Sequence, residues 1–212
     1  MDEMSARQQI VDIARQCAAK GFFESTDGNI SCRLQNGRVL VTPAGICKAG
    51  LTPEALILTN LDGEAEPPTS GSRPTSELAM HLHVYRHRPD IRAVLHAHPP
   101  YATALSVAGL PFPDDIIPET LRVLGEVPTA AYARPGTPAM GEVLTPDLLR
   151  HDNFLLSHHG TLCLAESVER ALINLERIEH TARVYFIASQ MGGAKKLPAS
   201  EVEQLRKLYA CK

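Results

Sequence analysis

Residues 91–100 read IRAVLHAHPP, and this segment constrains the fold of the chain more than any other. An apolar run of the kind found in buried strands leads directly into His96 and His98, and two prolines follow. Residues two positions apart on a strand point to the same face. Both imidazoles therefore leave one side of one strand end, about 6–7 Å apart along the backbone. The segment predicts a strand that presents a pair of metal ligands at its end.

A second apolar strand, NFLLSHHG (residues 153–160), also ends in histidines. Neighbours on a strand face opposite ways, so His158 and His159 cannot easily join the same site, and spacing alone does not choose between them. Three neutral imidazoles around a divalent ion leave one coordination position open, as in catalytic zinc sites. We therefore expect one histidine of this pair to complete a three-histidine metal site.

The segment RPTSELAMHLHVYR contains a carboxylate next to a helix start. Thr75 and Ser76 suit a helix N-cap, which places Glu77 in the first turn, where the helix dipole favours a negative charge. Glu77 is thus either a simple capping acid or a functional carboxylate. His81 lies four residues on, on the same helical face, and a packed histidine is the favoured interpretation.

Three further segments have the chemistry of anion sites: residues 27–29 (DGN), residues 42–48 (TPAGICK), and the Thr75-Ser76 pair. Glycine-rich turns expose backbone N–H groups, and a helix N-terminus adds orphan amides and a favourable dipole. For each segment taken alone, ordinary turn chemistry is the favoured interpretation.

Hydrophobic periodicity predicts a mixture of hairpins and helices. Expected helices cover residues 5–20, 75–88, 101–108, 140–151, 168–191 and 200–212. Expected strands cover residues 29–34, 37–42, 55–61, 91–98, 125–133, 153–160 and 161–166, with a type I′ hairpin turn at Asn36-Gly37. No linker divides the chain, so we expect residues 1–212 to form a single α/β domain with a mixed sheet covered by helices on both faces.

Charge and hydropathy exclude some classes of partner. The net charge is −3 and no basic block occurs, so nucleic acid is not an expected partner. No stretch reaches the roughly 18 apolar residues of a membrane span. The N-terminus carries early acids and lacks the apolar core of a signal peptide, which favours a cytoplasmic protein.

Taken together, the motifs resemble the class II aldolase/adducin family, which includes L-fuculose-phosphate aldolase and L-ribulose-5-phosphate 4-epimerase. The resemblance covers nearly the whole chain in family order. It is carried by GNIS (28–31), TPAG (42–45), TSE (75–77), HAH (96–98), YARPGT (132–137) and HHG (158–160).

The resemblance implies a three-layered α/β/α domain with a central mixed β-sheet. It implies that His96, His98 and His159 bind Zn²⁺, or another divalent metal such as Mn²⁺ or Co²⁺, because the family ligand is the histidine directly before the glycine. Glu77 would be the catalytic acid/base. Other residues would form the phosphate and substrate pocket, namely Asn29, Gly45, Thr75 and Ser76. Family members usually form C4-type homotetramers with the active site near a subunit interface.

Two departures from the family pattern affect the site. Where fuculose-phosphate aldolase has Thr-Gly in its phosphate loop, this chain has Ala44-Gly45, and Lys48 would compensate with a cation. That aldolase also uses a tyrosine from the middle of the chain as a proton donor, whereas residues 113–122 (PDDIIPETLR) contain none. Glu119 and Tyr209 are the candidate replacements.

The expected activity is that of a zinc-dependent class II aldolase. It would reversibly cleave a sugar 1-phosphate into dihydroxyacetone phosphate and an aldehyde through a metal-stabilised enediolate. Its partner would be a small phosphorylated sugar or ketose. Other reactions on the same scaffold are decarboxylation of a 3-oxo acid phosphate, dehydration of methylthioribulose phosphate and epimerisation of a pentulose phosphate. A non-catalytic binding module of the adducin type is less favoured, because such modules lack the metal histidines.

Overall fold

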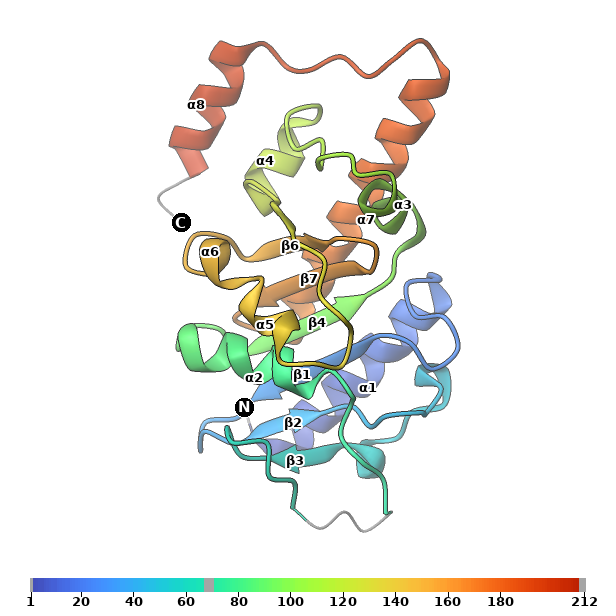
Figure 1. Cartoon of the computed structure of the whole chain (residues 1–212), viewed down its shortest axis with the longest axis vertical. Helices are drawn as coiled ribbons and strands as arrows, with labels where there is room; N and C mark the ends of the chain where they lie inside the picture. The colour runs from blue at the N-terminus through green and yellow to red at the C-terminus, as the bar shows by residue number, and fades with distance from the viewer. Residues whose placement is uncertain (1, 67–70, 210–212) are drawn as a thin grey trace.

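A seven-stranded sheet forms the centre of the computed structural model, which describes residues 2–66 and 71–209 (Figure 1). The strand order is β3-β2-β1-β4-β7-β6-β5, and all neighbours are antiparallel except the parallel pair β5 and β6. The strands are β1 (Asn29–Arg33), β2 (Val39–Val41), β3 (Ile57–Thr59), β4 (Ala93–Ala97), β5 (Thr129–Ala130), β6 (Asn153–Leu156) and β7 (Gly160–Ala165). The predicted mixed sheet is confirmed.

Helices cover both faces of this sheet. One face packs against α1 (Glu3–Ala19), α3 (Pro100–Val107) and α7 (Val168–Gln190). The other face packs against α2 (Leu78–His87), α5 (Ala139–Glu142) and α6 (Thr145–Leu148). The remaining helices are α4 (Pro118–Leu124), α8 (Ala199–Tyr209) and the short 3₁₀ helices η1 (Lys48–Gly50) and η2 (Pro53–Ala55). Figure 1 shows α4 and α8 together at the end of the molecule farthest from β3.

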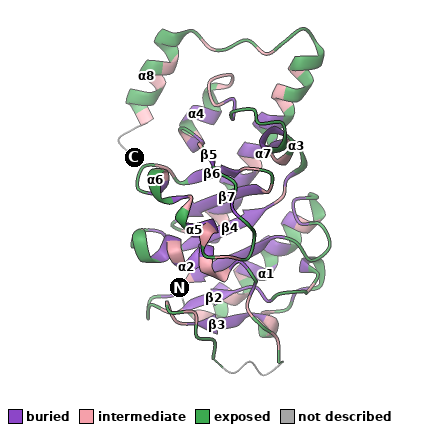
Figure 2. Ribbon diagram, in the orientation of Figure 1, coloured by how far each residue is buried: buried purple, intermediate pink, exposed green. Residues whose placement is uncertain are grey.

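The side chains of the central strand β4 alternate between the two faces of the sheet, and each face has its own apolar core. On β4, Leu95 joins the core beneath α1 and α7, whereas Val94 joins the core beneath α2. His96 follows Val94 by two residues and so faces the α2 side. Every residue of β4 is buried, and Figure 2 shows burial concentrated on the strands while α8 has no buried residue. The side chain of His96 therefore points from the sheet toward the start of α2.

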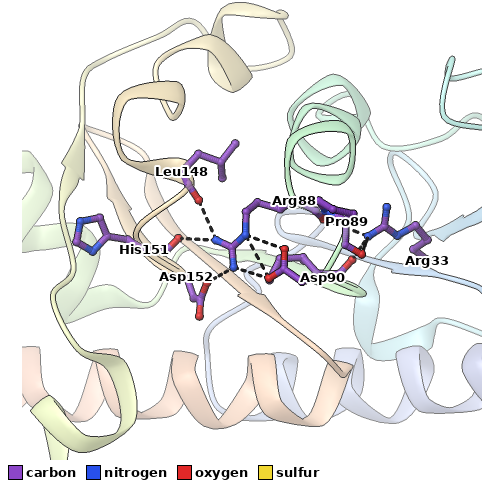
Figure 3. Close-up of polar contacts among 8 residues, drawn as sticks. Arg33, Arg88, Pro89, Asp90, Leu148, His151 and Asp152 are labelled. Atoms are coloured by element: carbon purple, nitrogen blue, oxygen red, sulfur yellow. Dashed lines mark hydrogen bonds and ion pairs between the residues drawn. The ribbon is translucent and has the colours of Figure 1, made fainter. Parts of the chain in front are cut away.

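Two arginines hold the segments just before β4 and β6 in place, and these two strands lead to the clustered histidines (Figure 3). Arg33 donates hydrogen bonds to backbone carbonyls at the end of α2 and in the turn before β4. Arg88 donates to the carbonyl of Leu148 at 2.8 Å and to the carboxylates of Asp90 and Asp152. These contacts tie the end of α2 to the starts of both β4 and β6.

Several predicted elements differ in detail from the observed ones. The loop at Asn36-Gly37 has three residues, because Leu34 pairs with Arg38 and only Gly37 has a positive φ, of 82°. A type I′ turn needs positive φ at both central residues, so that prediction was wrong. The helix predicted over 140–151 is two short helices, because Pro146 has no N–H to continue a single one. Helix α4 was not predicted, although Pro118 begins it and Gly125 ends it.

The start of α2 also differs from the prediction. Glu77, rather than Thr75 or Ser76, occupies the N-cap position, and its side chain makes no capping hydrogen bond. The backbone N–H of Thr75 bonds to the Thr42 carbonyl at 3.1 Å, which holds this residue outside the helix. The Glu77 carboxylate is therefore available for other contacts. The tail helix α8 agrees with its prediction up to Tyr209, and residues 210–212 lie outside the described residues.

No helix within the described ranges combines the length and apolar character needed to cross a lipid bilayer.

Candidate active site

Three histidines converge where β4 ends. His96 lies on β4, His98 directly follows it, and His159 lies in the turn that joins β6 to β7. Because β4 and β7 are neighbours in the sheet, this turn lies beside the end of β4. One ring nitrogen from each histidine lies within 4.8 Å of the others, and the Nε2 atoms of His96 and His98 are 3.0 Å apart. Ligands about 2.0–2.1 Å from one tetrahedral ion lie roughly 3.3 Å apart, so the cluster has the dimensions of a metal site.

The turn between β6 and β7 separates the two adjacent histidines. His158 has a positive φ of 55° and an exposed side chain, and its ring meets Tyr132 edge-on at 6.4 Å. His159 instead points into the cluster. A Cβ on Gly160 would lie 2.4 Å from the carbonyl oxygen of Ala97. Only a glycine therefore allows the turn to approach β4 closely enough to deliver His159.

The ring nitrogens that face away from the cluster support metal binding. Nδ1 of His96 donates to the Thr161 carbonyl at 2.8 Å, which fixes the ring with Nε2 facing the cluster. Nδ1 of His98 lies 3.6 Å from the Asp27 carboxylate. Burial, followed by the charge of His96, lowers the pKa of both His98 and His159 to about 4. Neutral imidazole is the form that binds a metal ion.

Glu77 lies directly against these histidines. Its Oε2 is 3.1 Å from Nε2 of His96 and accepts a hydrogen bond of 2.8 Å from Nδ2 of Asn29. Its Oε1 is 3.4 Å from Nε2 of His159 and has no hydrogen-bond partner. Burial acts to raise the pKa of Glu77, but the opposing charge and hydrogen bond of His96 hold that pKa below its usual range. A buried carboxylate anion at this point favours a cation among the imidazoles.

Glu77, His98 and His159 open onto a cavity of about 310 Å³, whereas His96 is fully buried beside them. All the predicted phosphate and substrate residues line this cavity: Asn29, Gly45, Lys48, Thr75 and Ser76. They come from β1, the loop after β2, η1 and the segment before α2. Segments far apart in the sequence are thus brought together as the motifs predict.

Lys48 is the cation of this cavity. Its side chain is buried, and its Nζ donates to the carbonyls of Thr26 and Ile46 at 2.8 and 2.9 Å. An ammonium group has three donors, so one N–H remains for a ligand. Burial lowers the pKa of Lys48, while the charge of Asp27 opposes this shift. The arrangement offers a fixed positive charge to an anionic group.

The two candidate proton donors lie elsewhere. Glu119 is exposed on α4 and Tyr209 lies on α8, and neither lines the cavity of its own chain. Other residues at the site were not singled out from the sequence as contributors. Asp27 beside His98 belongs to residues 27–29, which were considered as an anion site and not as a partner of a histidine, and Pro135 and Gly136 lie in the YARPGT segment of the resemblance. The carbonyl of Thr161 has no sequence signal at all.

Comparison with known proteins shows which family this chain matches. The family model of the class II aldolase and adducin N-terminal domain matches residues 8–186. The 3-oxo-tetronate 4-phosphate decarboxylase of Pectobacterium atrosepticum is 36% identical over 189 residues, covering 87% of this chain and 85% of that protein. The 5-deoxy-D-ribulose 1-phosphate aldolase of Bacillus thuringiensis is 32% identical over 206 residues, covering 96% of this chain and 94% of that protein.

A solved structure is also similar along the chain. The crystal structure of YgbL from Klebsiella pneumoniae superimposes with a TM-score of 0.89 and 32% sequence identity. The match covers 97% of this chain and 100% of that one. The three-layered fold with a central mixed sheet is therefore shared along the whole length of that protein.

Proposed function

This chain belongs to the class II aldolase and adducin family, and from that premise we propose that it decarboxylates a 3-oxo acid phosphate, with 3-oxo-tetronate 4-phosphate as the substrate. It is an enzyme of that superfamily. The observation that carries the proposal is the convergence of three imidazoles and a carboxylate beside a cavity that also contains a buried lysine. The motifs alone favoured aldol cleavage, and the similarity to decarboxylases supports the alternative reaction instead.

The chemistry of such a substrate matches the site. The carboxylate of 3-oxo-tetronate lies β to a ketone, so loss of carbon dioxide leaves an electron pair that the carbonyl can accept. The product of this step is an enediolate, which becomes dihydroxyacetone phosphate once carbon is protonated. A divalent ion held by His96, His98 and His159, for which we propose Zn²⁺ with Mn²⁺ or Co²⁺ as alternatives, would supply a Lewis acid that stabilises this negative charge.

The remaining groups have separate tasks in the proposal. Glu77 moves a proton from solvent to carbon: Oε1, which has no hydrogen-bond partner among the described residues, takes the proton up and then delivers it. Lys48 and the hydroxyls of Thr75 and Ser76 hold the phosphate, together with the amide of Asn29 and the backbone of Gly45. These groups fix the substrate so that its oxo group faces the imidazoles.

The number of proton-transferring groups favours decarboxylation over aldol chemistry. Aldol cleavage needs one group at the enediolate carbon and a second at the oxygen of the departing aldehyde. Carbon dioxide leaves without any proton transfer, so a decarboxylase needs only the first. Among the described residues that line the cavity, no tyrosine is present and Glu77 is the one glutamate. Glu77 alone is enough for decarboxylation, whereas aldol cleavage would need a second group, such as Asp27 of this cavity or a residue of a neighbouring subunit.

The proposal also includes the assembly that the family resemblance implies. We expect the whole chain to act as one domain within a homotetramer whose active site lies near a subunit interface. In that arrangement Glu119 or Tyr209 would reach a neighbouring cavity, although both lie outside the cavity of their own chain. Aldol cleavage stays as the second candidate because the similarity to an aldolase covers 96% of this chain.

The decisive experiment compares the two reactions on the zinc-loaded protein. The 3-oxo acid phosphate is generated in situ, and carbon dioxide and dihydroxyacetone phosphate are quantified against a protein-free blank. A parallel series supplies dihydroxyacetone phosphate with a panel of aldehydes. Carbon dioxide release without condensation supports the proposal, whereas condensation without carbon dioxide release establishes the aldolase.

A further inference from the structure

A chain of buried polar groups runs behind Glu77, away from the cavity. It comprises Asn29 and Ser31 on β1 and His81 and Tyr85 on α2, and each of the four side chains is buried. Consecutive heavy atoms are within hydrogen-bond distance: 2.8 Å from Tyr85 Oη to Ser31 Oγ, 2.7 Å from Ser31 Oγ to His81 Nδ1, 2.6 Å from His81 Nε2 to Asn29 Oδ1, and 2.8 Å from Asn29 Nδ2 to Glu77.

The spacing of these residues in the sequence explains why they interleave. Glu77, His81 and Tyr85 are four apart, whereas Asn29 and Ser31 are two apart. Four residues of an α-helix rise about 6 Å, and two residues of a strand rise about 6.6 Å. A helix lying along a strand therefore places one helical residue between each pair of strand residues on the facing side.

The Glu77 carboxylate lies at one end of this row of hydrogen bonds and fixes the direction of every bond in it. An ionised carboxylate only accepts, so Asn29 must use its N–H group on Glu77 and turn its carbonyl to His81. Nε2 of His81 must then carry the proton, which leaves Nδ1 to accept from the hydroxyl of Ser31. The oxygen of Ser31 in turn accepts from the hydroxyl of Tyr85. Burial lowers the pKa of His81 to about 3, so the ring is neutral near pH 7.

We propose that Ser31, His81 and Tyr85 are positioning residues for Glu77, which hold Asn29 in the one orientation that donates to Oε2. Oε1 is thereby left as the atom that exchanges a proton with the substrate, and it is the Glu77 oxygen without a hydrogen-bond partner. If His81 carried its proton on Nδ1 instead, the carbonyl of Asn29 would turn toward the Glu77 carboxylate. The two oxygens would repel each other, and the carboxylate would be displaced. The inference rests on the proposed role of Glu77, but the chain itself can be tested separately.

The first measurement reads the tautomer of His81 in the zinc-loaded protein. Nitrogen-15 NMR of histidine-labelled protein distinguishes a protonated Nε2 from a protonated Nδ1, and His81→Gln identifies the signal. We expect protonated Nε2 in the natural sequence. A protonated Nδ1, or a doubly protonated ring near pH 7, overturns the proposal whatever the activity of the protein.

The second measurement reads the consequence for turnover. Ser31→Ala removes the donor to His81, and we expect kcat to fall about 10–100-fold with the zinc content unchanged. KM should change by less than about threefold, because Lys48, Thr75 and Ser76 keep their phosphate contacts. Tyr85→Phe, one step farther from Glu77, should have a smaller effect than Ser31→Ala.

A matched control removes a buried hydroxyl pair elsewhere. Oγ1 of Thr181 lies 2.8 Å from Oγ1 of Thr120, and both residues are buried between α4 and α7. Thr181→Val should lower the free energy of unfolding without lowering kcat. If Ser31→Ala retains the kcat of Thr181→Val, the positioning role is wrong. If the natural protein does not act on the substrate, the proposed function fails. The tautomer of His81 then decides by itself whether the hydrogen bonds run in the proposed direction from Tyr85 to Glu77.

Discussion

Gly160 lies so close to Ala97 that a Cβ on the glycine would be 2.4 Å from the alanine's carbonyl oxygen and 2.7 Å from Cδ2 of His98. The contact is with backbone, which cannot rotate away as a flexible side chain can. The glycine therefore couples the turn that carries His159 to the strand end that carries the other two histidines.

This contact leads to a prediction for Gly160→Ala. The added methyl group should push the β6–β7 turn away from β4 and lower the zinc affinity at least tenfold, as loss of a supporting contact around a metal site does. Gly50→Ala is the control, because no atom lies within 4 Å of the Cβ position there and φ is not positive. Titration with a competing zinc chelator measures both variants, and equal affinities would contradict the prediction.

The adjacent histidines should differ sharply in their effect on the metal. His159→Ala removes one of three proposed ligands, so purified protein should contain almost no zinc and lose activity. His158→Ala removes an exposed ring from the neighbouring position and should retain the metal. Metal analysis by mass spectrometry checks both. Exposure of the natural protein to a chelator should abolish activity, and added Zn²⁺ should restore it. A zinc-replete His159→Ala protein would remove this residue from the ligand set.

Glu77→Gln should separate metal binding from proton transfer. The amide keeps the size of the carboxylate but cannot exchange a proton, so kcat should fall by about 10²–10⁴-fold. Zinc content should stay near that of the natural protein. Glu169→Gln makes the same change in the first turn of α7, outside the cavity, and should be fully active. A Glu77→Gln enzyme with unchanged kcat would exclude Glu77 as the acid/base.

Much of this site could be predicted because its residues follow the period of their elements. His96 and His98 share a strand face through period two, and the glycine after His159 is visible in the sequence. Lys48 was also identified, from a glycine-rich loop with one lysine. Each of these signals lies within a short segment, so it can be detected in a single sequence.

The unpredicted parts depend on contacts between distant segments. The hydrogen bond from Asn29 to Glu77 joins residues 48 positions apart, and it exists only because α2 lies along β1. The Thr161 carbonyl that orients His96 is a backbone atom with no residue preference. The shift of the α2 start to Glu77 follows from the backbone bond between Thr75 and Thr42. Periodicity gives the elements, but it does not give the pairings that hold the carboxylate.

Lys48→Met should weaken substrate binding rather than chemistry. A charge-assisted hydrogen bond to phosphate contributes about 1.5–3 kcal/mol, so KM should rise roughly 10–100-fold. Zinc content should not change, because Lys48 contacts carbonyl oxygens and no proposed ligand. Lys20→Met removes an exposed cation on the α1 side and serves as the control. Steady-state kinetics decides, and an unaltered KM for the phosphorylated substrate would contradict the role.

His81 should make the metal-free protein less stable as the pH falls. The folded protein holds His81 neutral down to a pKa of about 3, whereas the unfolded chain protonates it near the ordinary value of 6.5. Between these pH values the unfolded state binds more protons, so the free energy of unfolding decreases as the solution is acidified, by at most about 1.4 kcal/mol per pH unit for one group.

Urea titrations between pH 6.5 and 4.5, with a chelator present, test this effect. Over this interval the natural protein should lose on the order of 2 kcal/mol more than His81→Gln does. The other histidines titrate in both proteins, so the difference between the two slopes isolates His81. A variant with the same pH slope as the natural protein would mean that His81 takes up its proton equally in the folded and unfolded states, and that its burial does not hold it neutral.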